Sequence, residues 1–328
     1  MSQSRILGGG DSMDPRELLR VNAKKKIQYN IIMLHPITFS ISKEKICEGY
    51  YVKTKILSNL IPGDISTYIY NTEEEYYNEY KQSYFAITKK KAGWDCMRHY
   101  EILANGCIPY FIDIEQCPIN TMYLLPKNLF IESNILYDKF KNKNINELTE
   151  DLINEYTVLQ QKLIEYTKSY LTTDKMAEYI LKKTNHENVK KILYLSGDTG
   201  PDYLRCVTLH GFKTIFSNDC HDFPKVPHIY KSYDICYTDL YGKGISYTNL
   251  LEQNVHNDNL DNTIYEDIQN KYYDIVIYGS YHRGMPYYDL IYETYKPSEI
   301  ILICGEDMHC CDYNDFLQKG HHVFVREL

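Results

Sequence analysis

Residues 93–109 read GWDCMRHYEILANGCIP, and the fold that the sequence predicts follows from this stretch. Asp95 can cap a helix over 96–105, because its carboxylate can accept a hydrogen bond from a free N–H of the first turn. Gly106 can then end that helix in the left-handed conformation that glycine tolerates. The apolar run 107–112 is typical of a buried strand. The stretch therefore predicts a loop, a helix and a strand, the repeating unit of α/β proteins.

Two charged side chains of this helix suggest a ligand. Arg98 and Glu101 lie three residues apart on one face, near the carboxyl edge of the preceding strand, where open α/β sheets bind ligands. A guanidinium and the free N–H groups of a helix start can neutralise a diphosphate, and a carboxylate one turn further can accept hydrogen bonds from ribose hydroxyls. The alternative is an ordinary surface salt bridge, and the spacing alone does not choose between the two.

Short apolar runs alternate with amphipathic stretches on both sides of the motif, which indicates an α/β protein with mainly parallel sheets. A helix is expected over 72–82, with Thr72 as N-cap and Glu75 as its capping-box partner. Residues 145–184 have helical periodicity and contain neither Pro nor Gly, so they predict one or two helices that end near Asn185. Upstream strands are expected at 27–34, 67–70 and 84–88.

The alternation restarts after residue 185 and predicts a second Rossmann-like unit. A helix is expected from about residue 201 and another over 287–295, with a loop-rich section between 217 and 273. A chain of 328 residues suits two domains of roughly 100 to 200 residues each. We therefore predict a leader at 1–26 and two domains, 27–185 and 186–328. The strands expected in the second domain are 191–195, 214–216, 273–278 and 299–304, with a possible edge strand at 320–325.

Three of these strands are followed by polar loops that begin with or near glycine. If the strands are parallel neighbours, their loops converge along one edge. There Arg283 or the turn at Gly197 could contact phosphates, and His282 or Asp198 could act as a base on an acceptor hydroxyl. The alternative is that these side chains only form turns and caps. The candidates in these loops are Gly197, Asp198, Thr199, Gly200, Arg205, His282, Arg283, Glu306 and Asp307.

The composition argues against several classes of protein. The net charge of -8 disfavours a general nucleic-acid binder. No run approaches the ~18 apolar residues of a membrane helix, and no signal peptide is visible, so a cytoplasmic protein is expected. The 10 cysteines show no CxxC pair and no zinc-finger spacing, so we expect reduced thiols. We also expect no metal site, including in the His- and Asp-containing segments 218–222 and 309–312.

Residues 98–110, RHYEILANGCIPY, resemble the donor-binding element of glycosyltransferases of the GT-B fold, including the exostosin-like group, which has the form (R)xxEALAxGCIPV. The resemblance covers about residues 67–111. It implies that Glu101 binds the ribose of a nucleotide-sugar donor and that Arg98 contacts the diphosphate. It also departs from the family pattern, because Pro109 stands where many members have a second acidic residue. The further donor-site candidates in this segment are Thr88, Gly93, Asp95 and His99.

The resemblance implies two Rossmann-like domains in a GT-B-like arrangement, with the donor-type domain first instead of last. We therefore predict a glycosyltransferase that transfers a sugar from a nucleoside-diphosphate donor to a glycan or other hydroxyl acceptor, with neither cofactor nor obligatory metal. One alternative is a non-catalytic module that binds a sugar nucleotide. Another is a nucleotide- or S-adenosylmethionine-type enzyme in the second half, because a strand, the turn at 196–200 and a helix also begin such pockets.

Overall fold

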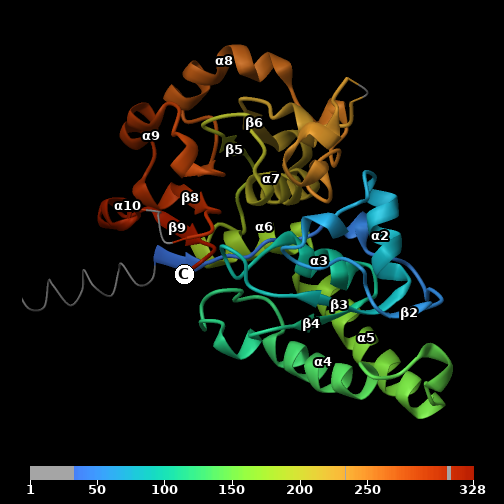
Figure 1. The fold of residues 1–328 in the computed structure, drawn as a ribbon. Helices are drawn as coiled ribbons and strands as arrows, with labels where there is room; N and C mark the ends of the chain where they lie inside the picture. Colours follow the sequence, from blue (N-terminus) through green and yellow to red (C-terminus); the bar gives the residue numbers. More distant parts are fainter. Residues whose placement is uncertain (1–32, 233, 309–311) are drawn as a thin grey trace, which may run out of the picture.

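The computed structural model describes residues 33–232, 234–308 and 312–328, and it contains two parallel β-sheets (Figure 1). The order of the six-stranded sheet is β1-β9-β8-β7-β5-β6, and that of the three-stranded sheet is β2-β3-β4. All pairings within both sheets are parallel. The predicted α/β class with parallel sheets is therefore confirmed. The predicted leader at 1–26 lies outside the described residues.

The first unit is built on the three-stranded sheet. Figure 1 shows α4 and α5 below this sheet and α2 and α3 above it. Thr72 caps α2 as expected, because its hydroxyl accepts a hydrogen bond from the N–H of Glu75 at 3.2 Å. Gly106 follows α3 with a φ of +61°, the left-handed conformation expected there. The elements of this unit are β2 (Lys55–Leu57), α2 (Glu73–Lys81), β3 (Ser83–Thr88), α3 (Met97–Ala104), β4 (Ile108–Phe111), α4 (Lys127–Phe140) and α5 (Glu150–Tyr170).

The second unit is built on the six-stranded sheet, and helices cover both of its faces. Side chains of α8, α9 and α10 pack on one face, and those of α6 and α7 pack on the other. The strand order reverses between β5 and β7, which makes their carboxyl ends the expected ligand crevice of this sheet. Its elements are β1 (Leu34–Pro36), α6 (Thr173–Thr184), β5 (Ile192–Leu195), α7 (Tyr203–Phe216), β6 (Cys220–Phe223), α8 (Asp258–Gln269), β7 (Ile275–Tyr278), α9 (Tyr288–Thr294), β8 (Ile300–Cys304), α10 (Asn314–Lys319) and β9 (His322–Val325).

Several expected elements were wrong. Residues 67–70 form no strand, because a short 3-10 helix, Ile65–Thr67, ends there. Residues 214–216 are the last turn of α7, and the strand begins only at Cys220, after Ser217 turns the backbone to a φ of +50°. The section 217–273, which was expected to be rich in loops, also contains the helix α8. Short apolar runs fit both a buried helix and a strand, which explains these errors.

The two ends of the described chain meet in one sheet. Of the strand expected at 27–34, residues 27–32 lie outside the described part, and the observed strand β1 pairs with β9 of the second unit. The strand expected at 320–325 is present as β9, but its expected position at the edge was wrong, because it lies between β1 and β8. The pairing of β1 with β9 is not visible in local patterns, because the partners are almost 290 residues apart, as in Leu34 opposite Val323.

One hydrophobic core connects the two units. It includes Phe85 and Phe130 of the first unit and Val207 and Phe324 of the second. α6, which continues from α5, packs closely on α7, since a Cβ added to Gly211 would lie 2.0 Å from the carbonyl oxygen of Thr173. In the described part of the chain, no helix is long and apolar enough to cross a membrane. Cys304 is disulfide-bonded, so the expectation of reduced thiols does not hold for it.

Candidate functional site

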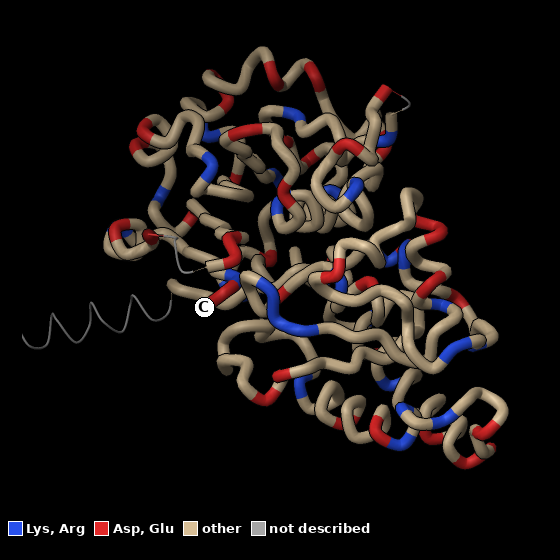
Figure 2. Tube along the Cα trace, in the orientation of Figure 1, with Lys and Arg blue, Asp and Glu red and all other residues tan. Residues whose placement is uncertain are grey.

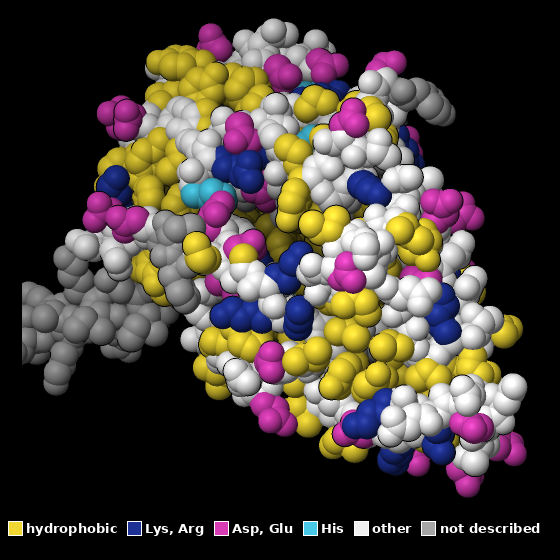
Figure 3. All heavy atoms as spheres, in the orientation of Figure 1, with side chains coloured by type: hydrophobic (Ala, Val, Ile, Leu, Met, Phe, Trp, Pro, Cys, Tyr) yellow, Lys and Arg dark blue, Asp and Glu magenta, His cyan; other side chains and the backbone are white. Residues whose placement is uncertain are grey.

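A cavity of about 560 Å³ lies where the carboxyl edges of the two sheets face each other. Figure 3 shows the hollow between the two units, with Lys and Arg side chains along its lower rim. Its volume falls within the range of small-molecule sites, roughly 300 to 1,000 Å³. The first unit contributes the loop after β3 and the start of α3. The second contributes the start of α7, the loops after β7 and β8, and the segment 241–245.

The first turn of α3 has no side-chain cap. Cys96 is the N-cap residue and makes no capping hydrogen bond, so the prediction that Asp95 caps this helix was wrong. The Asp95 carboxylate instead accepts hydrogen bonds from the N–H of Phe39 at 2.8 Å and from the hydroxyl of Tyr100 at 3.0 Å. Burial raises the pKa of Asp95 to about 6. The uncapped start of α3, with its partial positive charge, therefore faces the cavity.

Arg98 is a buried cation that lines this cavity. Arg98 is only 8% exposed, and its Nη1 atom has no hydrogen-bond partner in the described structure. No salt bridge joins Arg98 to any other residue of the described chain, including Glu101. A buried charge that forms no ion pair is unfavourable, and its position at a helix start adds further positive potential. An anionic ligand in the cavity would compensate both.

Glu101 lines the same cavity and is held from both units. Its Oε1 accepts a hydrogen bond from the hydroxyl of Ser246 at 2.6 Å, and its Oε2 accepts one from Tyr76 at 2.8 Å. Burial raises the pKa of Glu101, while these two hydroxyls and Arg98 act in the opposite direction. Because a carboxylate has about four acceptor positions, two contacts do not exhaust it. Glu101 can therefore still accept hydrogen bonds from a ligand.

The chain end fixes the loop that precedes α3. Glu327 accepts hydrogen bonds from the N–H groups of Trp94 and Asp95 at 2.9 Å and 3.0 Å. Arg326 pairs with Glu327 at 3.0 Å and also contacts the carbonyl of Asp95. Gly93 is required beside this pair, because an added Cβ would lie 2.7 Å from Oε1 of Glu327. The residues that follow the last strand of the second unit thus position a cavity loop of the first.

Two other predicted donor residues lie behind the cavity wall. Thr88 and His99 are fully buried and do not line the cavity. The two His99 ring nitrogens contact the Thr88 hydroxyl at 2.9 Å and the carbonyl oxygen of Trp94 at 2.8 Å. Burial lowers the pKa of His99 to about 4. His99 therefore supports the loop as a neutral side chain, and Gly93, Asp95, Arg98 and Glu101 are the predicted donor residues that reach the cavity.

The loop after β5 packs against the loop after β7 and leaves no open pocket at its glycine. A Cβ on Gly197 would lie 2.3 Å from the carbonyl oxygen of Arg283. Asp198 pairs with Arg205 at 3.2 Å and with Arg283 at 3.6 Å. None of Gly197, Asp198, Thr199, Gly200 and Arg205 lines the cavity, whereas Arg283 does.

The loops after β7 and β8 bring a histidine to a cavity carboxylate. His282 does not line the cavity, but its Nε2 lies 2.8 Å from Oε1 of Glu306, which does. Asp307 also lines the cavity and pairs with Arg326. Asp202 caps α7 and pairs with Arg283 at 3.1 Å. The predicted catalytic histidine therefore reaches the cavity only through Glu306.

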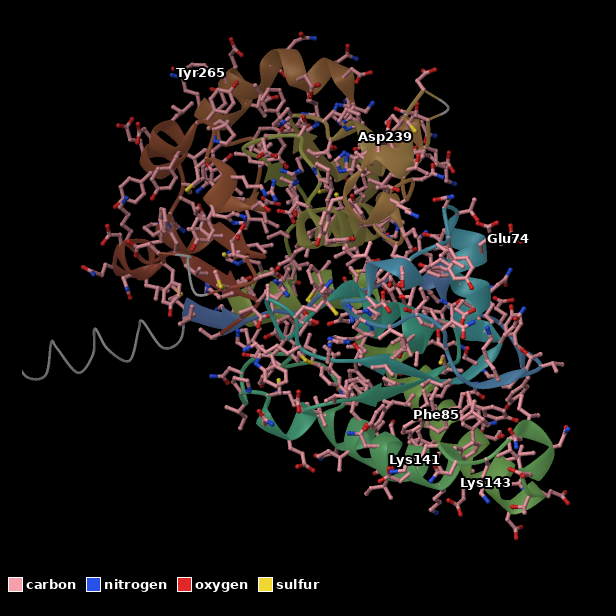
Figure 4. All side chains as sticks on the ribbon, in the orientation of Figure 1. Glu74, Phe85, Lys141, Lys143, Asp239 and Tyr265 are labelled. Carbon is pink, nitrogen blue, oxygen red and sulfur yellow. The ribbon has the colours of Figure 1, made fainter. Side chains whose placement is uncertain are left out.

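Sequence reasoning missed the segment 241–246 and the aromatic wall of the cavity. Lys243 donates hydrogen bonds to the carbonyl of Tyr70 at 2.6 Å and to the side chain of Asn71 at 2.8 Å. In Figure 4, Asp239 marks the chain just before this segment, across from Glu74 on the first unit. The only local signal was Gly-Lys-Gly, in which all three residues have positive φ. The aromatic residues that line the cavity are Phe39, Tyr68, Tyr70, Tyr76, Tyr203 and Tyr241.

A basic segment stands at the cavity mouth. Residues 89–91 are three consecutive lysines after β3, seen as a blue run on the tube in Figure 2. Lys91 is exposed and lines the cavity. Away from this cavity, the described residues hold one group that could bind a metal, which consists of His221, His256 and Asp261.

The site is thus a cleft with a buried unpaired cation, a buried carboxylate, two helix starts and an aromatic wall. No family model, curated protein or solved structure matches this chain. The chemistry of the cavity and the resemblance of residues 98–110 are therefore the two indications of a function.

Proposed function

We propose that the cavity between the two units binds a nucleoside-diphosphate sugar and that the protein is a glycosyltransferase. The observation that carries this proposal is Arg98, a buried guanidinium with an unpartnered Nη1 in the wall of a ligand-sized cavity. A diphosphate supplies the missing negative charge and matches the planar donors of a guanidinium. The other buried or half-buried cations of the wall are already paired, Arg283 with Asp202 and Lys243 with carbonyls of the first unit.

The surroundings of Arg98 favour a phosphate over other anions. The start of α3 lines the cavity without a side-chain cap, and free N–H groups at a helix start are a common phosphate-binding device. Lys91 adds an exposed positive charge at the mouth. Glu101 lies one turn deeper in α3, where it can accept hydrogen bonds from the two ribose hydroxyls of the same nucleotide. The tyrosines of the wall offer flat surfaces for a base or a sugar.

The arrangement also provides a candidate base. In the proposed reaction the oxygen of an acceptor hydroxyl bonds to the anomeric carbon of the donor sugar. The bond from that carbon to the diphosphate oxygen breaks, and the diphosphate leaves with the electron pair. Arg98 and the start of α3 stabilise the charge that develops on it. The hydroxyl proton passes to Glu306, which His282 holds in place at 2.8 Å. Asp198, the other predicted base, is paired with two arginines outside the cavity.

A second function, a non-catalytic module that binds a sugar nucleotide, also has an observation in its favour. Three of the cavity carboxylates are already engaged: Asp95 by Phe39 and Tyr100, Asp202 by Arg283, and Asp307 by Arg326. Glu306, whose Oε1 lies 2.8 Å from Nε2 of His282, is the lining carboxylate that we propose as the base. The two functions differ in one outcome, because a binding module retains its ligand unchanged.

One experiment tests the proposal and separates these two functions. The full chain is titrated calorimetrically with uridine, guanosine, adenosine and cytidine diphosphates, and the matching sugar nucleotides are then followed by chromatography for release of the diphosphate. A glycosyltransferase binds at least one diphosphate and releases it from the sugar donor. A binding module binds it but releases nothing. If none of the diphosphates binds, both functions are rejected.

A further inference from the structure

A second group of polar side chains lies between β6 and α8, on the second unit. His221 belongs to β6, His256 directly precedes the N-cap of α8, and Asp261 is in the first turn of that helix. Figure 4 labels Tyr265, which lies one turn further along α8. One ligand atom from each of the three residues lies within 4.8 Å of the others. None of the three lines the cavity described above.

The contacts within this group are close, but they are not all hydrogen bonds. Nε2 of His221 lies 3.1 Å from Oδ1 of Asp261, yet each of these two atoms lacks a hydrogen-bond partner in the described structure. A hydrogen bond requires the N–H to point at the acceptor. Ligands of a metal ion instead point at a common centre and approach each other side by side. His221 is only 1% exposed, so water does not compensate its ring nitrogens.

The second histidine is oriented by a carboxylate behind it. Nδ1 of His256 lies 2.9 Å from Oδ1 of Asp222, and its Nε2 lies 3.2 Å from Oδ2 of Asp261. Asp222 is held in turn by Lys213 at 2.8 Å and by the hydroxyl of Tyr230 at 2.7 Å. A carboxylate that accepts a hydrogen bond from one ring nitrogen and directs the other toward the ion is the usual support of a metal-binding histidine.

We propose that His221, His256 and Asp261 bind one divalent transition-metal ion, with Zn²⁺ as the expected metal. Asp261 lies 3.1 Å from Nε2 of His221 and 3.2 Å from Nε2 of His256. Zinc–nitrogen and zinc–oxygen bonds of about 2.0 to 2.2 Å in a tetrahedron separate neighbouring ligands by roughly 3.3 Å, which is close to these two distances. Two imidazoles and one carboxylate suit Zn²⁺ or Fe²⁺ and disfavour Mg²⁺ and Ca²⁺, which prefer oxygen ligands. Three protein ligands leave a coordination position for water.

Access and charge are compatible with this ion. The side chain of Asp261 is 31% exposed, so the site opens to solvent through the first turns of α8. Asp258, one turn earlier and largely exposed, places a further carboxylate oxygen 3.5 Å from Nε2 of His256. The two negative charges of Asp222 and Asp261 exceed the single positive charge of Lys213, so the site has a net negative charge before an ion binds.

The alternative is a purely structural network in which protons, not a metal, connect the histidines and carboxylates. Calorimetric titration of the full chain with Zn²⁺, after dialysis against a chelator, distinguishes the two. The variants are Asp261→Asn and His221→Gln, and Glu266→Gln, an exposed carboxylate on the same helix, is the control. We expect one Zn²⁺ per chain in the wild type and the control. Both site variants should weaken Zn²⁺ binding by at least about 100-fold. Replacing a residue that only supports a ligand already weakens metal binding by about 10- to 100-fold, and these variants replace the ligands themselves.

Co²⁺ provides a second measurement that does not depend on the variants being folded. Bound at this site, Co²⁺ should give the visible bands of a four- or five-coordinate ion without the charge-transfer bands of a thiolate. The proposal is overturned if the wild type binds no Zn²⁺, or if Asp261→Asn and His221→Gln, shown by circular dichroism to be folded, bind it as tightly as the control. Thiolate bands would also overturn it, because they place the ion on cysteines. Fe²⁺ titrated without oxygen identifies the preferred metal.

Discussion

Arg98 and Glu101 lie one turn apart on α3 and line the same cavity, yet no ion pair joins them in the described chain. Glu101 is instead held by Ser246 and Tyr76, and Nη1 of Arg98 has no partner. The ordinary salt bridge that the spacing allowed is therefore not what the structure contains. A cation and an anion held separately on one helix face are available to two different parts of a ligand.

Replacing Glu101 with Gln should weaken binding of the cognate nucleoside diphosphate by about 10-fold, because an amide is a poorer acceptor than a carboxylate for two ribose hydroxyls. Calorimetry measures the change, and Glu74→Gln, an exposed site on α2, is the control. A 2′,3′-dideoxyribose analogue should bind the wild type and the variant alike. Unchanged affinity for the normal ribose in a folded Glu101→Gln chain would remove Glu101 from the ligand site.

Glu306→Gln should lower the rate of sugar transfer by about 100-fold or more, the usual contribution of a positioned base. The Kd of the donor should change little, because Glu306 is proposed to act on the acceptor. His282→Gln should lower the rate less, since it acts through Glu306. Steady-state kinetics and donor titration separate the two effects. Loss of donor affinity in parallel with the rate would instead make Glu306 a donor-binding residue.

Gly93→Ala should destabilise the protein by about 1 to 3 kcal/mol, because the new methyl group meets Glu327. The same substitution should have a smaller effect when Glu327 is already Ala, since the obstructing carboxylate is then absent. Urea unfolding of the two single variants and the double variant forms the required cycle. Purely additive effects would show that Glu327 does not restrict this loop.

Asp95 should give the stability of the protein a specific pH dependence. Its pKa is raised in the folded state from 3.8 to about 6, so the folded protein binds the proton more tightly than the unfolded chain. The resulting stabilisation is fully present below about pH 4 and is lost as the pH rises through 6. Asp95→Asn should therefore gain stability relative to the wild type over this range, by an amount on the order of 2 kcal/mol. Urea unfolding at pH 4, 5, 6 and 7 measures this difference, and a constant difference would contradict the assignment.

The sequence predicted the local features of the site well. The strand β3, the helix α3, the left-handed Gly106 and the strand β4 all follow from the pattern of residues 84–112, because each depends on neighbours in the chain. The prediction that Asp95 caps α3 was wrong because the partner of its carboxylate is distant in the chain. Its carboxylate bonds the N–H of Phe39, which is 56 positions away, and no local rule anticipates that competitor.

The parts of the site that sequence reasoning missed are non-local. Ser246 reaches Glu101 across 145 positions, and Glu327 reaches the N–H of Asp95 across 232. β1 joins the second sheet by pairing with β9 at the other end of the chain. These contacts depend on how the two units face each other, which hydrophobic periodicity does not encode. The glycines at 197 and 200 suggested a turn that binds a ligand. Gly197 is instead needed because the backbone of the loop after β7 packs directly against it.

The central claim is that the unpartnered guanidinium of Arg98 binds the phosphates of a nucleotide. Calorimetric titration of Arg98→Gln with the diphosphate that binds the wild type tests this directly, with Lys143→Gln, an exposed site far along the first unit, as the control. Loss of a charged hydrogen bond should weaken binding by about 10- to 100-fold, and removing a buried unpaired charge should leave the free protein at least as stable. The nucleoside without phosphates should bind both proteins equally. An Arg98→Gln chain that binds the diphosphate as tightly as the wild type would contradict the account.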